Sequence, residues 1–400
     1  MNRKNIIFTL LLVNFYQVSW ASEFTLTHFL NEVEKSNLDL KVEEFRNEAA
    51  TARATGIRMP APSFSLLQRR FENDNANGFE VSQTIPFPGK ISSEKEYREK
   101  AALAAESYQK GQINSILSLA RFIYIEYWLQ SEVLAALNEK RKIIIDHIKL
   151  AKSGVRSDSM LKIHLLKAES DLDLLDNQIL KEKQNLVEKK LKIAELLNWP
   201  SGKLPPSPSE PALSVLPNIQ VEESPQIRTL EHKVAMAQAK ESENKQAWLP
   251  DFKLSLMKMN QAQMMPEFTQ ISVGITLPFA FPWEPKSRSN EAQAIRKMTE
   301  YELQKGKRKI EYTQANIISE AEALKAQMTL IQSKLIPRAK ERMKIVHNIA
   351  PRDMNSLNDH RETMEAFTDL RLQVLSLRAK YEQIAAQLLQ YSPTKGAFYE

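Results

Sequence analysis

The chain has 400 residues, of which only nine are glycine and 26% are charged. Ala, Leu, Glu, Lys, Gln and Arg dominate, which is typical of long helices rather than of ordinary globular domains. The absence of cysteine excludes disulfides, thiolate metal sites and cysteine nucleophiles. The net charge of +6 is spread along the chain without basic clusters among aromatic residues, so we expect solvated helix faces and no nucleic acid partner.

Residues 1–21 have the features of a secretory signal peptide. Arg3 and Lys4 carry positive charge, the apolar run Ile6–Val18 follows, and Ser19-Trp20-Ala21 resembles a small-x-small cleavage site. A membrane anchor is the alternative, but this run is shorter than the roughly 20 residues that a membrane-spanning helix needs. We therefore predict an exported protein.

A helical pattern over Glu23–Arg58 opens the mature chain and ends at two prolines. Two strands are predicted next, at 63–71 and 79–87, because apolar and polar residues alternate there. The run E-N-D-N-A-N-G at 72–78 is rich in turn-forming residues and would join them. The apolar positions of this first hairpin, 63–87, are Phe64, Leu66, Phe79, Val81 and Ile85.

The stretch 81–90, V-S-Q-T-I-P-F-P-G-K, marks a change from strand to helix. Pro86 and Pro88 cannot donate to a sheet ladder, and proline fits the first turn of a helix. Gly89 can adopt backbone angles that a side chain forbids. We interpret this stretch as a strand-to-helix elbow that includes Gln83 and Lys90.

Two long helices are predicted after the elbow, at 90–154 and 158–198. The first would be roughly 97 Å long at 1.5 Å per residue. Asn198 is suited to a left-handed helix end. A proline-rich connector, 200–223, follows. In the second helix, apolar residues spaced by four and three predict a coiled-coil seam: Leu161, Leu165, Ala168, Leu172, Leu175 and Ile179.

The second half of the chain repeats this pattern. Pro62-Ser-Phe-Ser-Leu66 matches Pro250-Asp-Phe-Lys-Leu254, and Pro278 follows a strand as Pro86 does. We infer two structural repeats, 22–199 and 224–392, and a tail at 393–400. The second repeat would hold a helix, a hairpin at 251–277, a long helix at 284–349 with a possible kink at Pro337, and a coiled-coil helix at 355–391. Its apolar strand positions are Phe252, Leu254, Leu256, Ile271, Val273 and Ile275.

The two hairpins fit either a soluble sheet or a membrane barrel with a wet lumen, and alternation alone does not decide between them. Phe71, Phe79 and Phe87 near the strand ends, and the lack of other strands in the sequence, favour the barrel. Four strands cannot close a barrel, and open sheet edges are not tolerated in lipid. The strand pattern therefore predicts more than one copy of the chain.

The motif Q-T-I-P-F-P-G-K at 83–90, the matching L-P-F at 277–279, the duplication and the long flanking helices resemble the TolC-like outer membrane factor family. This resemblance implies a homotrimer in which each copy gives four strands to a twelve-stranded transmembrane β-barrel, while the long antiparallel coiled-coil helices form a periplasmic α-barrel. It also implies an outer membrane exit duct with a large periplasmic part, serving an efflux pump or a type I secretion system. Its partners would be outer membrane lipid, a periplasmic adaptor and an inner-membrane pump.

The elbow motif matches one subgroup of the family, whereas the lipid anchor of other members has no counterpart here. The P-F-P-G-K form of the elbow is most similar to members serving heavy-metal cation pumps, although the exported substrate does not follow from it. Family members that carry a lipid anchor attach it to a cysteine, which this chain lacks.

The resemblance places a periplasmic tip at the turns 152–160 and 349–357. Asp359 and Ser356 fall where some members carry pore-constricting acids, and a ring of Asp359 carboxylates would favour cations. The alternative is that Asp359 is a solvated helix residue. Met160 stands where the family has an acid. The adaptor-facing residues implied by the resemblance are Gly154, Met160, Leu161, Pro351, Arg352 and Asp353.

Two other classes of protein remain open from the sequence, a soluble coiled-coil protein and an enzyme. A soluble periplasmic coiled-coil adaptor or structural protein would share the long helices. An enzyme would need a catalytic motif, and we find no nucleotide-binding, hydrolase or metalloprotease signature, so we predict no catalytic residue and no cofactor. The six histidines lack metal-ligand spacing. Four methionines near the second hairpin loop would suit soft copper, but apolar filling is the other explanation: Met257, Met259, Met264 and Met265.

Overall fold

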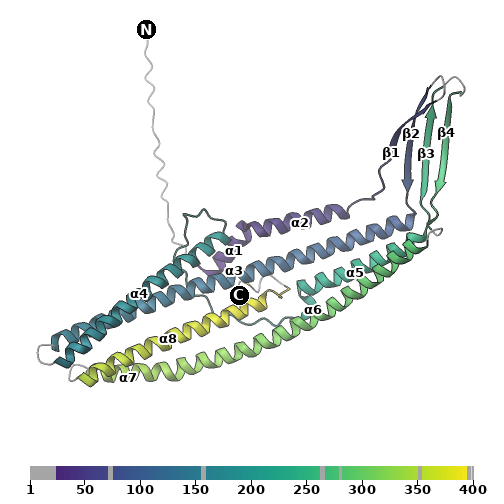
Figure 1. The fold of residues 1–400 in the computed structure, drawn as a ribbon. Coiled ribbons are helices and arrows are strands. Elements are labelled where there is room, and N and C mark those ends of the chain that lie inside the picture. Colours follow the sequence, from purple (N-terminus) through teal and green to yellow (C-terminus); the bar gives the residue numbers. More distant parts are fainter. Residues whose placement is uncertain are drawn as a thin grey trace, which may run out of the picture.

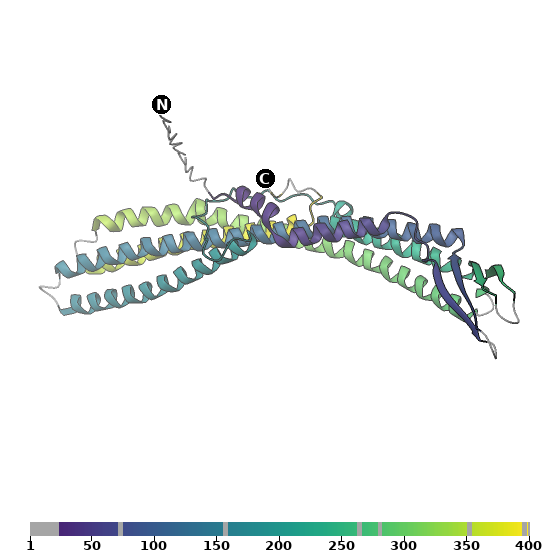
Figure 2. The ribbon, with the colours of Figure 1, turned by 90° about the horizontal axis from the view of Figure 1, so that it is seen from above.

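The fold is an elongated bundle of helices with a small sheet at one end (Figure 1). Seen from above, the bundle is narrow and gently bent (Figure 2). The expected combination of long helices with four antiparallel strands is confirmed. Residues 1–23, and with them the predicted signal peptide, lie outside the described part. This computed structural model describes residues 24–70, 75–154, 159–261, 266–278, 282–349, 354–393 and 398.

The first helical segment differs from the prediction of one helix over 23–58. It forms two helices, α1 (Leu26–Ser36) and α2 (Leu38–Ala54), because Asn37 has an extended backbone between them. The Asn37 side chain accepts hydrogen bonds from the backbone N–H groups of Asp39 and Leu40, and it donates to the Leu196 carbonyl at 3.1 Å. Asn37 therefore caps α2 and holds it to the end of a distant helix.

Four strands form one antiparallel sheet in the order β1-β2-β3-β4. The second strand begins at residue 75, not at 79, because the turn-forming residues 75–78 pair with the end of β1. Pairing with a neighbouring strand has overridden their local preference. The other predicted limits, namely both ends of 63–71, residue 87 and the ends of the hairpin 251–277, lie within two residues of the observed ones. The observed bounds are β1 (Ser63–Arg70), β2 (Asn75–Ile85), β3 (Phe252–Met259) and β4 (Phe268–Ile275).

Helices α3 (Pro88–Gly154) and α4 (Ser159–Leu196) form the first long hairpin. From Leu165 to Ile179, the predicted seam of α4 packs against Leu137, Ile144 and Ile148 of α3. The left-handed conformation expected at Asn198 is confirmed, with φ of 52°.

The second repeat contains α5 (Pro225–Lys245), α6 (Trp283–Leu330), α7 (Ile336–Ile349) and α8 (Met354–Leu389). The chain is helical from Trp283 to Ile349, as predicted over 284–349, but a π-helical turn at Ile331–Leu335 divides this run into α6 and α7. Pro337 lies two residues after the π-helical turn and has no N–H for the ladder, so the hydrogen-bond pattern changes just before it.

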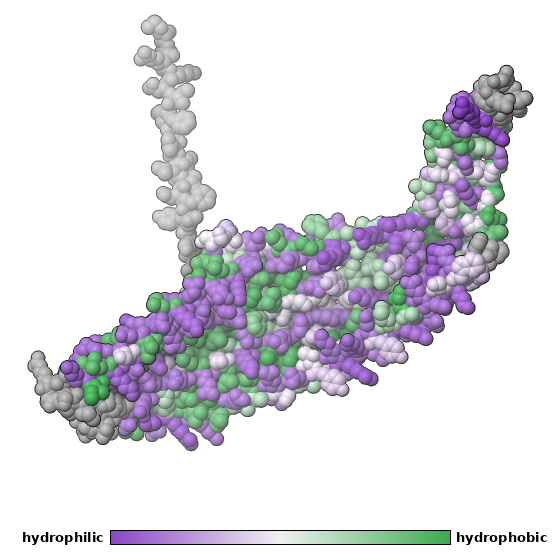
Figure 3. All heavy atoms as spheres, viewed as in Figure 1, coloured by the Kyte–Doolittle hydropathy of each residue, from purple (hydrophilic) through white to green (hydrophobic). Residues whose placement is uncertain are grey.

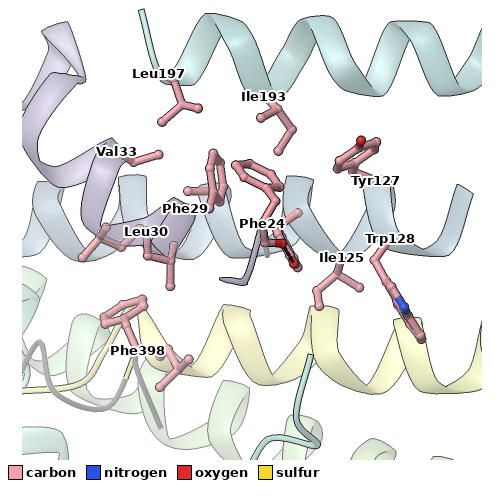
Figure 4. Close-up of a cluster of buried hydrophobic side chains, with 14 of the residues drawn as sticks. Phe24, Phe29, Leu30, Val33, Ile125, Tyr127, Trp128, Ile193, Leu197 and Phe398 are labelled. Atoms are coloured by element: carbon pink, nitrogen blue, oxygen red, sulfur yellow. Dashed lines mark hydrogen bonds between the residues drawn. The ribbon is translucent and has the colours of Figure 1, made fainter. Parts of the chain in front are cut away.

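The main core lies at the middle of the rod, where α1, α3, α4 and α8 meet (Figures 1 and 4). Phe24 at the start of the described chain and Phe398 near its end are both buried there. The Tyr124 hydroxyl donates to the Phe24 carbonyl at 2.6 Å and lies 2.9 Å from the Ser209 carbonyl of the connector. Phe24, Phe398 and the connector are therefore all held at this level.

Candidate functional site

The sheet has one strongly apolar face. Strand pairing aligns the apolar residues in rows, one of which joins Phe64, Val81, Leu256 and Ile271. Figure 3 shows hydrophobic side chains on the sheet and strongly hydrophilic ones beside its hairpin ends. The residues predicted to face the membrane all share this face: Phe64, Leu66, Phe79, Val81, Ile85, Phe252, Leu254, Leu256, Ile271, Val273 and Ile275.

Apart from Phe79, which is half-buried, these side chains are exposed although they are apolar. Leu66 is 81% exposed, Ile271 72% and Val273 71%. No part of the described chain covers this face, which a water-soluble sheet would bury against another layer.

The opposite face is polar along most of its length. A row of four serines crosses all four strands, from Ser63 through Ser82 and Ser255 to Ser272. The Ser63 and Ser82 hydroxyls lie 2.7 Å apart. Such a surface is suited to contact with water.

The two outer strands leave open edges. Strand β1 pairs only with β2, and β4 pairs only with β3, among the strands of the described chain. The unpaired N–H and C=O groups of these edges can accept further strands.

The elbow between β2 and α3 is held by Asp251, which the sequence reasoning did not single out. The Lys90 ammonium lies 2.8 Å from the Asp251 carboxylate, which also accepts the Phe87 N–H at 3.1 Å. The Asp251 N–H donates to the Thr276 hydroxyl at 2.7 Å, and the Thr276 N–H donates to the Asp251 carbonyl at 2.9 Å. One residue before β3 thus connects the ends of β2 and β4.

The other elbow residues have structural roles as well. A side chain at Gly89 would place its Cβ 2.2 Å from the Gln246 amide oxygen, while the Gln246 amide nitrogen donates to Ser93 at 2.8 Å. The Gln83 side chain donates to the Pro60 carbonyl at 2.7 Å. Pro86 follows β2, Pro88 begins α3 and Pro278 follows β4.

A buried ion pair lies at the middle of the rod. The Arg121 guanidinium of α3 is 3.6 Å from the Glu382 carboxylate of α8, and these side chains are 3% and 0% exposed. Glu382 accepts the Ser214 N–H of the connector at 2.8 Å, and Arg121 donates to the Phe398 carbonyl at 2.9 Å. Burial lowers the pKa of Arg121, and the Glu382 charge opposes that change. No local periodicity signals this pair.

Tyrosines of the helices also bind the connector at the middle of the rod, near the buried ion pair. The Tyr127 hydroxyl donates to the Pro206 carbonyl at 2.6 Å, and burial raises the pKa of Tyr127 to about 12, with a contribution from Tyr124. The Tyr381 hydroxyl donates to the Ser214 carbonyl at 2.9 Å. The proline-rich connector is therefore fixed across the helices by side chains of α3 and α8.

The predicted tip residues lie at the end of the rod opposite the sheet. Gly154 is the last residue of α3, and Met160 and Leu161 lie in the first turn of α4. Ser356 and Asp359 lie near the start of α8, where the Asp359 side chain is exposed. Pro351, Arg352 and Asp353 lie outside the described residues.

Ion pairs join the two helical hairpins on the way to this tip. Arg361 of α8 lies 2.7 Å from Asp171 of α4, and Arg371 of α8 pairs with Glu139 of α3. Among the described residues, no three His, Asp or Glu side chains are grouped so that they could hold a metal ion. Within the same residues, no helix combines the length and the hydropathy needed to span a bilayer.

Comparisons by sequence find no matching protein-family model and no similar curated protein. Solved structures are similar in fold over nearly the whole chain. The chain resembles CusC, described as forming a transmembrane channel, with a TM-score of 0.77 at 15% identity over 94% of this chain and 95% of CusC.

Two further structures show the same likeness. The MtrE outer membrane channel of Neisseria gonorrhoeae, solved in its open state, has a TM-score of 0.78 at 14% identity, over 92% of this chain and 88% of that one. The outer membrane protein VceC of Vibrio cholerae has a TM-score of 0.75 at 13% identity, over 94% and 96%. The chain therefore has the outer membrane factor, or TolC-like, fold.

Proposed function

We propose that this chain is one subunit of an outer membrane channel that serves as the exit duct of a tripartite efflux or type I secretion system. The observation that carries the proposal is the sheet, which combines an exposed apolar face, a polar face and two open edges at one end of a long helical rod. The similarity in fold to outer membrane channels supports it.

The apolar face of the sheet is the surface that meets lipid. Each of the strands β1, β3 and β4 has eight residues. Eight residues follow a path of about 27 Å, which at the tilt of barrel strands gives a height of about 19–22 Å, close to the roughly 25 Å apolar band of outer membrane barrels. The serine row on the other face then lines a water-filled lumen.

The open edges require further copies of the chain. Strand direction alternates from β1 to β4, so β4 of one copy can pair antiparallel with β1 of the next. Such head-to-tail contacts close into a ring when the rotation per copy permits. Three copies, as the family resemblance implies, make a twelve-stranded barrel without an edge in lipid.

The helices continue this ring as a periplasmic tunnel. Helix α3 has 67 residues and is therefore about 100 Å long. An apolar stripe on α4 is exposed in the single chain and would pack on helices of the next copy: Ile163, Leu166, Leu174, Leu180, Val187 and Leu191. A tunnel of this length would let cargo bypass the periplasm.

The position of Phe24 supports export with cleavage of residues 1–21. The Phe24 ring lies 5.8 Å from that of Tyr124 at mid-rod, about 45 Å from the end of α3 at 1.5 Å per residue. Residues 19–23 reach roughly 17 Å when fully extended. The apolar run Ile6–Val18 could then not remain in a membrane at the tip while Phe24 stays in the core.

The tip is the proposed contact with the periplasmic adaptor and, through it, with the inner-membrane pump. Asp359 is the proposed aperture residue. The elbow motif adds no support for a heavy-metal cargo, because Lys90 pairs with Asp251 and Gly89 leaves room for the Gln246 side chain, which are structural roles.

Planar-bilayer conductance of the detergent-extracted protein tests this function. Steady conductance is expected, and a water-soluble protein without conductance would favour a coiled-coil adaptor instead. Two neighbouring substitutions sharpen the test. Val273→Lys places a charge in lipid at a cost of about 2–4 kcal/mol and should block outer membrane assembly, whereas Ser272→Lys faces the lumen and should assemble. Equal assembly of both variants would contradict the assignment of the faces.

A further inference from the structure

The polar face of the sheet becomes largely apolar near the hairpin ends. On the face that carries the serine row, the outermost row that crosses all four strands joins Leu67, Gly78, Met259 and Phe268, and the pair of Arg69 with Ala76 lies beyond it. Together with Ala76 and Met257 these apolar side chains form one cluster, in which Ala76 is 0% and Met259 4% exposed. This end of the otherwise polar face is therefore largely apolar, with Arg69 at its rim.

At the same level the opposite face becomes mixed, because Leu66 and Phe79 share a row with polar residues of β3 and β4. Gln68 pairs with Asn77, and Lys258 pairs with Thr269. The Lys258 ammonium also lies 2.9 Å from the Glu267 carboxylate. A face that leaves the lipid and enters water is expected to change in this way, but that does not explain why the inner face turns apolar.

Gly78 is a specific adaptation to this cluster. A Cβ added at Gly78 would lie 2.3 Å from the Met259 sulfur and 2.2 Å from the Lys258 carbonyl oxygen. The glycine thus allows the thioether of Met259 to lie directly over β2. The cluster is a packed layer rather than a scatter of surface residues.

We propose that this cluster, defined by Leu67, Ala76, Met257, Met259 and Phe268, forms an apolar collar around the outer end of the pore and selects amphiphilic or apolar cargo over hydrated ions. The inference rests on the proposed channel function. Repeated in each copy, the cluster surrounds the lumen about 14 Å beyond the serine row, four residues along each strand. Apolar constrictions oppose the passage of ions because water leaves them readily.

The collar narrows the class of exported substrate. A hydrated hard ion such as K⁺ or chloride would lose water there, and the thioethers of Met257 and Met259 are poor ligands for hard ions. A molecule with an apolar part gains contact with Leu67, Met259 and Phe268 at the same place. The collar therefore favours apolar or amphiphilic organic compounds over hydrated hard ions as cargo.

Cysteine labelling from outside intact cells tests the collar independently of the tip, and the chain has no cysteine of its own. Ser255→Cys lies in the serine row below the collar, and Gln261→Cys lies above it. Each is treated with membrane-impermeant thiol reagents of equal size, one neutral and one charged. We expect the charged reagent to be slower at Ser255→Cys by tenfold or more, relative to the same ratio at Gln261→Cys. Equal ratios at both sites would overturn the collar.

Two adjacent leucines provide matched variants. In the Ser255→Cys background, Leu67→Ser alters the collar and should raise the rate of the charged reagent at least tenfold, whereas Leu66→Ser alters the opposite face and should leave it unchanged. Phe268→Ser should act as Leu67→Ser does, so that one variant that fails to assemble leaves the other to decide. Unchanged rates in the assembled collar variants would contradict the proposal.

A second pair of cysteine variants distinguishes failure of the proposed channel function from failure of the collar. Ser272→Cys should react with the reagents and Val273→Cys should not, because these neighbours face lumen and lipid. If Val273→Cys reacts and Ser272→Cys does not, the proposed membrane orientation is wrong. If this pair behaves as expected while the ratios at residues 255 and 261 are equal, only the collar is wrong.

Discussion

The Lys90 ammonium at the start of α3 lies 2.8 Å from the carboxylate of Asp251, the residue before β3, so one ion pair joins the two structural repeats at the elbow. Its side chains are 20% and 27% exposed, which limits screening by water. We expect Lys90→Gln to destabilise the fold by about 1 kcal/mol, measured by thermal unfolding in detergent. Lys95→Gln, which removes an exposed pair with Glu99 on the same helix, should cost less than about 0.5 kcal/mol. An equal loss of stability in both variants would mean that the elbow pair stabilises the fold no more than an exposed surface pair does.

Breaking the buried ion pair between Arg121 and Glu382 should destabilise the fold far more than breaking the elbow pair. Glu382→Ala leaves the Arg121 charge without its carboxylate partner, and breaking a buried pair costs about 3–5 kcal/mol. The double variant Arg121→Met with Glu382→Ala should lose less than the sum of the two single changes, because no isolated charge remains. Unfolding curves of the three variants measure this coupling. Strict additivity would show that the two side chains do not interact.

Alkaline pH should loosen the attachment of the connector. Burial raises the pKa of Tyr127 from its ordinary value of 10.0 to about 12, so the folded state favours the neutral phenol. This contribution to stability is complete below pH 10 and is lost as pH rises toward 12. Tyr127→Phe should flatten the fall in unfolding temperature over that range. Tyr312→Phe, at a side chain 76% exposed, should leave the fall as steep as in the native chain.

Two helical glycines should respond oppositely to alanine. In α3, a Cβ at Gly111 would have its nearest neighbour at 3.8 Å, so Gly111→Ala should stabilise by about 0.5–1 kcal/mol. In α6, a Cβ at Gly306 would lie 2.6 Å from the Leu230 methyl, so Gly306→Ala should gain nothing or destabilise. Chemical unfolding compares the two. If both variants are stabilised equally, the Leu230 side chain of α5 moves aside for the added methyl at no cost.

The charge of Asp359 should influence ion selectivity if it lines the aperture. We expect Asp359→Ala to reduce cation preference, seen as a smaller reversal potential across a salt gradient in a planar bilayer. Asp369→Ala, at another exposed position of α8 farther from the tip, is the control. The same reversal potential in both variants and the native channel would return Asp359 to the class of solvated helix residues.

Short-range periodicity was sufficient to predict much of this fold. The alternation in β3 and β4, the spacing of the seam on α4 and the left-handed end at Asn198 depend on residues a few positions apart, which is the range over which a helix or strand sets side-chain direction. The same alternation identified the residues of the apolar face. It failed where a partner strand changed the outcome, as at residues 75–78, which pair with β1 instead of forming a turn.

Contacts between distant segments needed the three-dimensional structure. Asn37 breaks the first helix partly because its side chain reaches Leu196, and Asp251 organises the elbow through Lys90 and Thr276. Arg121 and Glu382 are far apart in the chain and have no pattern around them that marks a pair. The apolar cluster on the inner face likewise required the strand register, because only pairing brings Leu67, Met259 and Phe268 into one row. Periodicity specifies which way a side chain points within its own element, whereas packing decides which other side chain it meets.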